Sequence, residues 1–144
     1  MTIRELLKNK GAELIGVHPD TTISNAIEKM AERNIGALLI VDDVGKPVGL
    51  FTERDALKAM VKSGMNLGTS KVEEFMTVDL VVIKPEDDLN TALSIMNKLK
   101  IRHLPVVEKG RVIGIISIRD VANALVGKLE SEVHYLKEYI SEGV

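Results

Sequence analysis

The stretch GKPVGLFTERD at residues 45–55 recurs, with the same pattern, as GRVIGIISIRD at residues 110–120. Each copy is a glycine turn, an apolar run, a hydroxyl residue and then Arg-Asp. Upstream, six residues of the first copy recur 66 positions later: Pro19, Ala26, Met30, Ile35, Leu38 and Val41. After the turn the spacing is 65, which places a one-residue length change between two strands, where hairpins tolerate it. The sequence therefore predicts two copies of one unit, with paired sites.

The composition is that of a compact soluble protein. The 144 residues are 45% hydrophobic and 28% charged, and a chain of this length can bury about 70% of its unfolded surface. The net charge of -2 gives no overall field to attract nucleic acid or an anionic membrane. The absence of cysteine excludes disulfides and thiolate metal sites, and no apolar run reaches ~18 residues. We therefore expect a cytoplasmic protein that binds neither nucleic acid nor membrane.

Hydrophobic periodicity predicts the same order of elements in both copies. Thr2 to Glu5 has the form of a capping box that opens a short helix, which Gly11 ends and which we expect to pack on the first copy. In the first copy we expect strands at 14–17, 37–41 and 48–51 and helices from Ile23 and Glu53. In the second we expect strands at 80–83, 104–107 and 112–116, a helix that is capped by Asp87 or Asp88 and runs to about Lys98, and a helix from Ile118. Each unit is thus β-α-β-β-α. Since no strand alternates cleanly, an α/β (α+β) fold with a covered sheet is predicted.

These residues resemble the CBS domain family, named for cystathionine beta-synthase, whose tandem pair is called a Bateman module. The resemblance covers about residues 12–128 and rests on Met76-Thr77, on IGALLIVDD and IRHLPVVEK, and on the two Arg-Asp endings. It implies two repeats packed as a pseudo-twofold pair, with these divisions: N-terminal helix 1–11, first repeat 12–66, second repeat 67–128, helix extension 129–144. It also implies a regulatory cleft between the repeats for AMP, ADP or ATP, or in some members S-adenosylmethionine, dinucleotides or magnesium.

The Arg-Asp ending has a chemical logic of its own. A hydroxyl residue at a helix start, such as Thr52, leaves backbone N–H groups and the positive end of the helix dipole free for an anion. Arg54 adds planar donors for phosphate, and Asp55 can accept both hydroxyls of a ribose. The alternative is that Thr52-x-x-Asp55 is only a capping box. Both interpretations apply equally to the second copy: Ser117, Arg119 and Asp120.

By position, the resemblance implies two unequal sites, each built from both repeats. The first joins Asp55 to Thr52, Arg54, Thr77, Val81, Ile101, Arg102 and His103. The second joins Asp120 to Ser117, Arg119, Ile15, Ile35, Gly36 and Ala37. The first repeat has Lys10-Gly11 in the place of Met76-Thr77, and Gly36-Ala37 in the place of Arg102-His103. We therefore expect the Asp55 site to bind phosphate better. No catalytic residue and no protein metal site is predicted, although a bound ATP could bring Mg²⁺ with it.

The last helix is long and carries an apolar stripe: Leu125, Leu129, Val133, Leu136 and Ile140. Such a stripe needs a partner. One possibility is that its first half packs on the repeats and the rest covers the N-terminal helix. The other is a contact between two copies of the chain, which is favoured because CBS modules often form flat homodimers.

Two classes of function follow. The first is a ligand-sensing regulatory module. A nucleotide in the cleft shifts the equilibrium between two conformations, and an unidentified partner protein recognises one of them. The second is a structural or scaffolding homodimer in which the two endings serve only as helix caps. No activated nucleophile, no pair of residues suited to general acid–base catalysis and no metal triad points to an enzyme. The sequence leaves open which adenosyl ligand binds, whether both sites fill, how a dimer is arranged and which protein is regulated.

Overall fold

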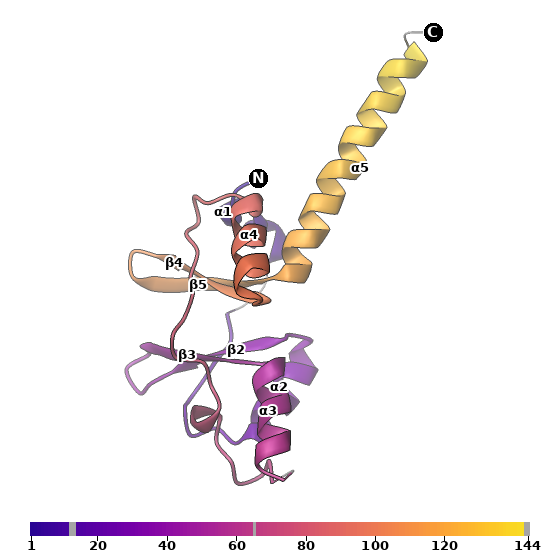
Figure 1. The fold of residues 1–144 in the computed structure, drawn as a ribbon. Helices are drawn as coiled ribbons and strands as arrows, with labels where there is room; N and C mark the ends of the chain where they lie inside the picture. Colours follow the sequence, from indigo (N-terminus) through magenta and orange to yellow (C-terminus); the bar gives the residue numbers. More distant parts are fainter. Residues whose placement is uncertain (12–13, 65, 143–144) are drawn as a thin grey trace.

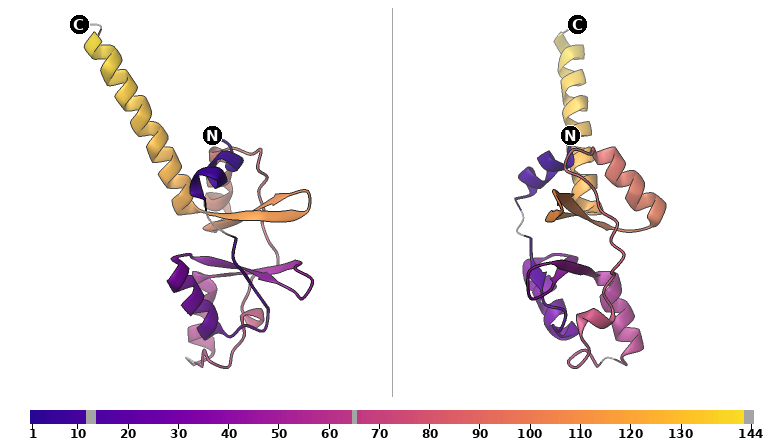
Figure 2. Two further views of the ribbon diagram at one scale, coloured as in Figure 1. Left: turned by 180° about the vertical axis from the view of Figure 1, so that it is seen from behind. Right: turned by 90° about the vertical axis from the view of Figure 1, so that its left-hand side faces the viewer.

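The computed structural model describes residues 1–11, 14–64 and 66–142. They form two lobes whose sheets face each other, with helices on the outer sides (Figures 1 and 2). The first lobe contains β1 (Gly16–Val17), α2 (Ile23–Arg33), β2 (Ala37–Val41), β3 (Pro47–Thr52) and α3 (Glu53–Lys62). The second contains α4 (Leu89–Leu99), β4 (His103–Glu108), β5 (Arg111–Ser117) and α5 (Ile118–Glu142). The predicted α/β fold is confirmed.

The helices begin where side chains satisfy their free N–H groups. The Thr22 hydroxyl accepts a hydrogen bond from the N–H of Asn25, and α2 follows it. In the second lobe, the cap that the sequence left open is Asp88, whose carboxylate accepts from the N–H and the hydroxyl of Thr91. These hydrogen bonds lower the pKa of Asp88. The caps therefore set corresponding helices at corresponding places in the two lobes.

The two sheets use the same register. β2 runs antiparallel to β3, and β4 runs antiparallel to β5. Val17 of β1 pairs in parallel with Ile40, and Ile83 pairs in parallel with Val106, 66 residues later at both positions. The predicted strand at 80–83 is wrong, because only Ile83 forms a bridge. The apolar residues before it have another role: Leu80 and Val81 line a cavity instead of pairing with a strand.

The central strands are apolar throughout because both of their faces are covered. Leu38 and Ile40 point into the core of the first lobe. Leu39 and Leu50 are also buried, but they line cavities whose other walls come from the second lobe. The sheet thus separates the lobe's own core from the region between the lobes, which explains the lack of polar alternation.

Each repeat sends its leading segment to the other lobe. α1 (Ile3–Lys10) lies in the core of the second lobe through Ile3 and Leu6, and the N–H of Ile3 donates to the carbonyl of Asp87 at 2.8 Å. The prediction that α1 packs on the first copy is therefore wrong. Reciprocally, the short 3-10 helix η1 (Val72–Glu74) places Val72 in the core of the first lobe. Apolar complementarity across the pseudo-twofold axis, and not nearness in sequence, decides these contacts.

The last helix, α5, packs on the body formed by the two lobes only through its first two turns. Val121 is fully buried, and Ala124 and Leu125 pack against the second core. From there α5 projects away from both lobes and does not cover α1 (Figures 1 and 2). The 25 residues of α5 are not apolar enough to cross a membrane, and neither is any other helix in the part of the chain described.

Candidate functional site

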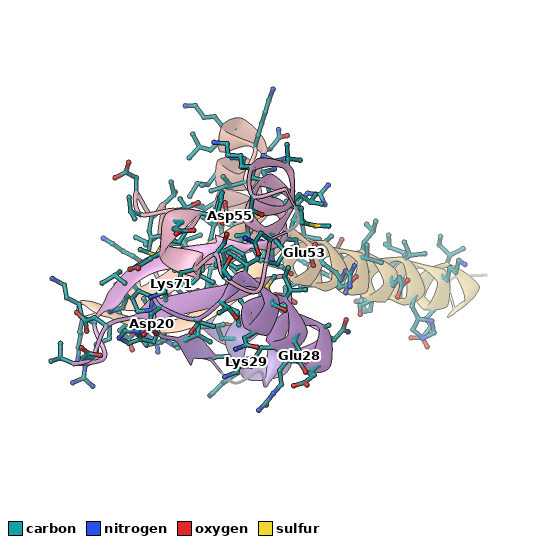
Figure 3. The ribbon with its side chains drawn as sticks, turned by 90° about the horizontal axis from the view of Figure 1, so that it is seen from below. Asp20, Glu28, Lys29, Glu53, Asp55 and Lys71 are labelled. Carbon is teal, nitrogen blue, oxygen red and sulfur yellow. The ribbon has the colours of Figure 1, made fainter. Side chains whose placement is uncertain are left out.

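The Arg-Asp ending of the first repeat forms the start of α3. The Thr52 hydroxyl accepts from the N–H of Asp55 at 3.3 Å, and Oδ2 of Asp55 accepts from the N–H of Thr52 at 2.9 Å and from its hydroxyl at 3.1 Å. Asp55 is only 5% exposed, and this reciprocal cap holds its carboxylate in one position. Figure 3 labels Asp55 together with Glu53, two residues earlier on α3. Both hydrogen bonds that this carboxylate accepts from Thr52 end on Oδ2, so Oδ1 is not used by the cap.

This carboxylate lines a cavity of about 430 Å³ between the lobes. The cavity wall includes all eight residues predicted for the first site: Thr52, Arg54, Asp55, Thr77, Val81, Ile101, Arg102 and His103. They come from the end of β3 and the start of α3, from the segment after η1, and from the segment that joins α4 to the start of β4. The structure thus brings together residues up to 51 positions apart, which is the set that the family resemblance groups.

The cavity wall combines an apolar surface with charges of both signs. Leu50, Val81 and Ile101 contribute apolar surface. The cations on the wall outnumber the carboxylates: they are Arg54, Lys58, Lys100 and Arg102, against Glu53, Asp55 and Asp79. Such a wall can hold a flat apolar group and an anion at the same time.

His103, on the second lobe, lines this cavity and also faces Gly36 of the first lobe. A Cβ on Gly36 would lie 3.0 Å from Nε2 of His103 and 3.0 Å from Oε1 of Glu53, so glycine allows the two lobes to approach each other here. Burial lowers the pKa of His103. The negative charge of Glu53 opposes this shift, and the positive charge of Lys10 adds to it. His103 is therefore neutral at ordinary pH.

The second Arg-Asp ending is capped in the same way but has an additional partner. The N–H of Ser117 donates to Oδ2 of Asp120 at 2.8 Å. Nζ of Lys10, at the end of α1, donates to the same oxygen at 2.8 Å and to the carbonyl of Ile115 at 2.7 Å. Burial opposes ionisation of Asp120, but the hydrogen bonds from Lys10 and Ser117 outweigh it and lower the pKa. A cation of the chain itself thus lies against the carboxylate of Asp120.

The first-repeat residues predicted for the second site are buried in the first lobe or lie beside His103. Ile15 and Ile35 pack against the first core, Ala37 is buried, and Gly36 faces His103. None of the seven lines the Asp55 cavity. The two endings are therefore similar in their caps and different in their surroundings.

Comparison with known sequences identifies the repeats. The sequence model of the CBS domain matches residues 3–62 and, a second time, residues 72–127. The chain belongs to the CBS domain family. The recognition made from the two Arg-Asp endings is therefore confirmed, and the chain is a tandem CBS pair.

Two curated relatives share much of this CBS pair. It is 33% identical over 150 residues to the mitochondrial CBS domain-containing protein CBSX3 of Arabidopsis thaliana, covering 99% of the chain and 73% of that protein. It is 39% identical over 110 residues to an uncharacterized 17.7 kDa protein of Acidianus ambivalens, covering 76% of the chain and 65% of the relative. The chain thus spans about two thirds to three quarters of these relatives.

Solved CBS structures have the same fold. A CBS-domain protein of Agrobacterium tumefaciens matches with a TM-score of 0.82 and 36% identity, over 85% of this chain and 92% of the other. A CBS protein of Pyrobaculum aerophilum complexed with AMP matches at 0.73 and 26%, over 83% and 89%. The CBS pair of protein MJ0100, in complex with 5′-methylthioadenosine and S-adenosyl-L-methionine, matches at 0.77 and 28%, over 89% and 98%. These complexes support the assignment of this CBS pair to the regulatory ligand-binding modules.

Eight residues that line the Asp55 cavity of this CBS pair were not predicted from the sequence: Leu50, Glu53, Leu57, Lys58, Asp79, Leu80, Lys100 and Pro105. Lys58 could have been found, because it lies four residues after Arg54 on the same helix and hence on the same face. Lys10 was noted only as a departure from the repeat, since nothing in its neighbourhood in the sequence points to Asp120. Within the described residues, no group of three or more histidine and acidic side chains is placed to hold a metal ion.

The lowered pKa of His103 predicts a pH dependence of stability. The unfolded chain takes up the proton more readily than the folded one, so the free energy of unfolding decreases as the pH falls from about 6.5 toward the folded-state pKa. We expect His103→Asn to reduce this decrease, measured by urea unfolding at pH 5.5 and 7.5. The control is His134→Asn, on the exposed part of α5. An equal decrease in the wild type and His103→Asn would contradict the assignment.

Proposed function

We propose that this CBS pair is a regulatory module that binds one adenosine nucleotide per chain, of the AMP, ADP or ATP type, in the Asp55 cavity. The observation that carries the proposal is the convergence of a held carboxylate, several cations and an apolar wall on one cavity between the lobes. The AMP complex of the Pyrobaculum aerophilum relative supports the choice of ligand.

Each part of the nucleotide has a matching part of the wall. The carboxylate of Asp55 accepts the ribose hydroxyls, and Oδ1 is the oxygen not used by the cap bonds to Thr52. The phosphate meets Arg54 and Arg102, and the base lies against Val81 and Ile101. Micromolar affinity requires about -8 kcal/mol. A charge-assisted hydrogen bond contributes only about 1.5–3 kcal/mol, so several of these contacts must act together.

The position of the cavity between the lobes explains how ligand binding could be transmitted to a partner protein. Asp55 belongs to the first lobe, and Arg102 to the second. A ligand that contacts both favours the arrangement in which the lobes are correctly spaced, by as much as its affinity differs between arrangements. A partner protein reads that arrangement. We further propose that the module acts in the cytoplasm as a homodimer, and that Mg²⁺ accompanies ATP when ATP is the ligand.

Calorimetry with AMP and 2′-deoxy-AMP tests the proposal. Loss of one ribose hydroxyl removes a hydrogen bond to Asp55, so we expect the deoxy nucleotide to bind about 10–100-fold more weakly. S-adenosylmethionine and 5′-methylthioadenosine serve as competitors, because the MJ0100 complex makes them the second candidate ligands. They lack the phosphate that the cationic wall suits, so weaker binding is expected. If none of these ligands binds, the structural homodimer is favoured.

The ion pair between Lys10 and Asp120 predicts a single ligand per chain. Lys10→Met places at position 10 the residue that the second repeat has at position 76 and frees Asp120. We expect the calorimetric stoichiometry to rise from about one toward two, with the first dissociation constant unchanged. Lys10→Arg, which keeps a cation beside Asp120, is the matched control. If Lys10→Met still binds one nucleotide, Lys10 is not what closes the second site.

A further inference from the structure

The projecting part of α5, residues 126–140, carries a regular apolar seam. Its members are Val126, Leu129, Val133, Leu136 and Ile140. All five are between 43 and 64% exposed, and this part of the helix lies beyond both lobes (Figures 1 and 2). The spacing alternates between three and four residues, which keeps the seam on one face of a helix that supercoils with another. Leu125, which packs on the body, is not part of it.

The residue types in the seam indicate how many helices meet. In heptad notation with position a at Val126, the a positions carry β-branched residues: Val126, Val133 and Ile140. The d positions carry Leu129 and Leu136. β-Branched residues at a together with leucine at d favour two-stranded parallel coiled coils.

The flanking charges agree with a second copy as the partner. Glu132 occupies position g, and Lys137 occupies the following e position. In a parallel pair of identical helices, g of one helix faces the next e of the other, so each Glu132 meets a Lys137 of opposite charge. Nε2 of His134 lies 3.0 Å from Oε1 of Glu138, at positions b and f on the side away from the seam. Complementary charges thus flank an apolar face.

We infer that α5 pairs with α5 of a second copy as a parallel, in-register, two-stranded coiled coil over residues 126–140. In-register pairing uses all five seam layers, whereas antiparallel pairing sets a against d and matches at most four. The two bodies then lie at the same end of the coil. This inference rests on the homodimer of the proposed function and specifies its geometry, but it does not depend on nucleotide binding.

Light scattering on the full chain, without nucleotide, tests the partner. The wild type is expected at twice the mass of one chain, and Leu129→Ser/Leu136→Ser at half of the wild-type mass. Ser131→Ala, at position f on the outer face, should leave the mass unchanged. Thermal unfolding is the folding control: a seam variant whose two lobes unfold at the same midpoint temperature as those of the wild type is folded. The inference is overturned if the wild type is monomeric, even if it pairs with another protein. It is also overturned if the seam variant stays dimeric.

Disulfide cross-linking tests the direction, because the chain has no cysteine of its own. Leu129→Cys and Ile140→Cys should each form a disulfide-linked dimer with themselves, and Ser131→Cys should not. Of the two antiparallel registers that match four layers, one sets position 140 beside position 122, so that Ile140→Cys does not cross-link with itself. The other sets position 129 beside position 140. Equal positions would then be about 16 Å apart along the axis, far beyond the reach of a disulfide. Cross-linking only in a mixture of the two variants therefore overturns the parallel geometry. Failure of AMP binding in separate calorimetry would instead affect only the proposed function.

Discussion

Asp55→Ala is expected to weaken AMP binding about 100-fold or more. The carboxylate accepts both ribose hydroxyls in the proposed complex, and each such hydrogen bond to a charged group contributes about 1.5–3 kcal/mol. The variant also loses its half of the cap on Thr52, which costs about 1 kcal/mol of stability. Calorimetry measures the first effect, and urea unfolding measures the second.

Asp120→Ala is the matched control for that experiment. Asp120 has the same place in its repeat and the same capping bond, to Ser117, and it also loses the ion pair with Lys10. We therefore expect at least as large a loss of stability as in Asp55→Ala, with little change in AMP affinity. Asp55→Asn separates the roles further, because its amide oxygen can still accept from Thr52 while the charge is lost. If Asp55→Ala lowers only stability and still binds AMP as the wild type does, capping was its whole role.

Gly49→Ala is expected to destabilise the fold by about 1–3 kcal/mol, the usual cost of overpacking. A Cβ at this position of β3 would lie 2.6 Å from Sδ of Met76 and 3.1 Å from the carbonyl oxygen of Thr77. That carbonyl cannot easily move, since Leu50 and Thr77 exchange two backbone hydrogen bonds of 2.9 Å. The Met76 side chain would have to turn aside, and the strand and the segment after η1 would have to move apart by a few tenths of an ångström. Urea unfolding gives the loss directly.

Gly114→Ala provides the comparison, because Gly114 is the counterpart of Gly49 65 residues later. There the new Cβ would lie 2.7 Å from Cδ2 of Leu7 and 3.3 Å from its Cδ1. These atoms end a flexible side chain on α1, which can turn aside at lower cost. We expect Gly114→Ala to lose less stability than Gly49→Ala. An equal or larger loss at Gly114 would show that α1 is held as rigidly as the backbone at Thr77.

Local signals account for most of the correct sequence predictions. Thr22, Thr52 and Ser117 each precede a helix and cap it as their residue type predicts. The repeat register placed β2 at Ala37–Val41. The resemblance to CBS domains, and not a local signal, grouped the Asp55 set, and all eight of its residues line one cavity. Local signals failed where burial by a distant segment decides the outcome. The apolar run at 80–83 lines that cavity over Leu80 and Val81 instead of forming a strand.

The sequence by itself determined the duplication, the order of the elements and the two Arg-Asp endings, because caps, turns and apolar periodicity act between residues close in the chain. The departures at Lys10-Gly11 and Gly36-Ala37 already predicted two unequal sites, but only the tertiary structure decided how the surroundings of the two endings differ. α1 crosses to the second lobe and brings Lys10 to Asp120, whereas Asp55 faces a cavity with cationic and apolar walls. Contacts between residues 110 positions apart depend on how the two lobes pack, and no local pattern encodes them.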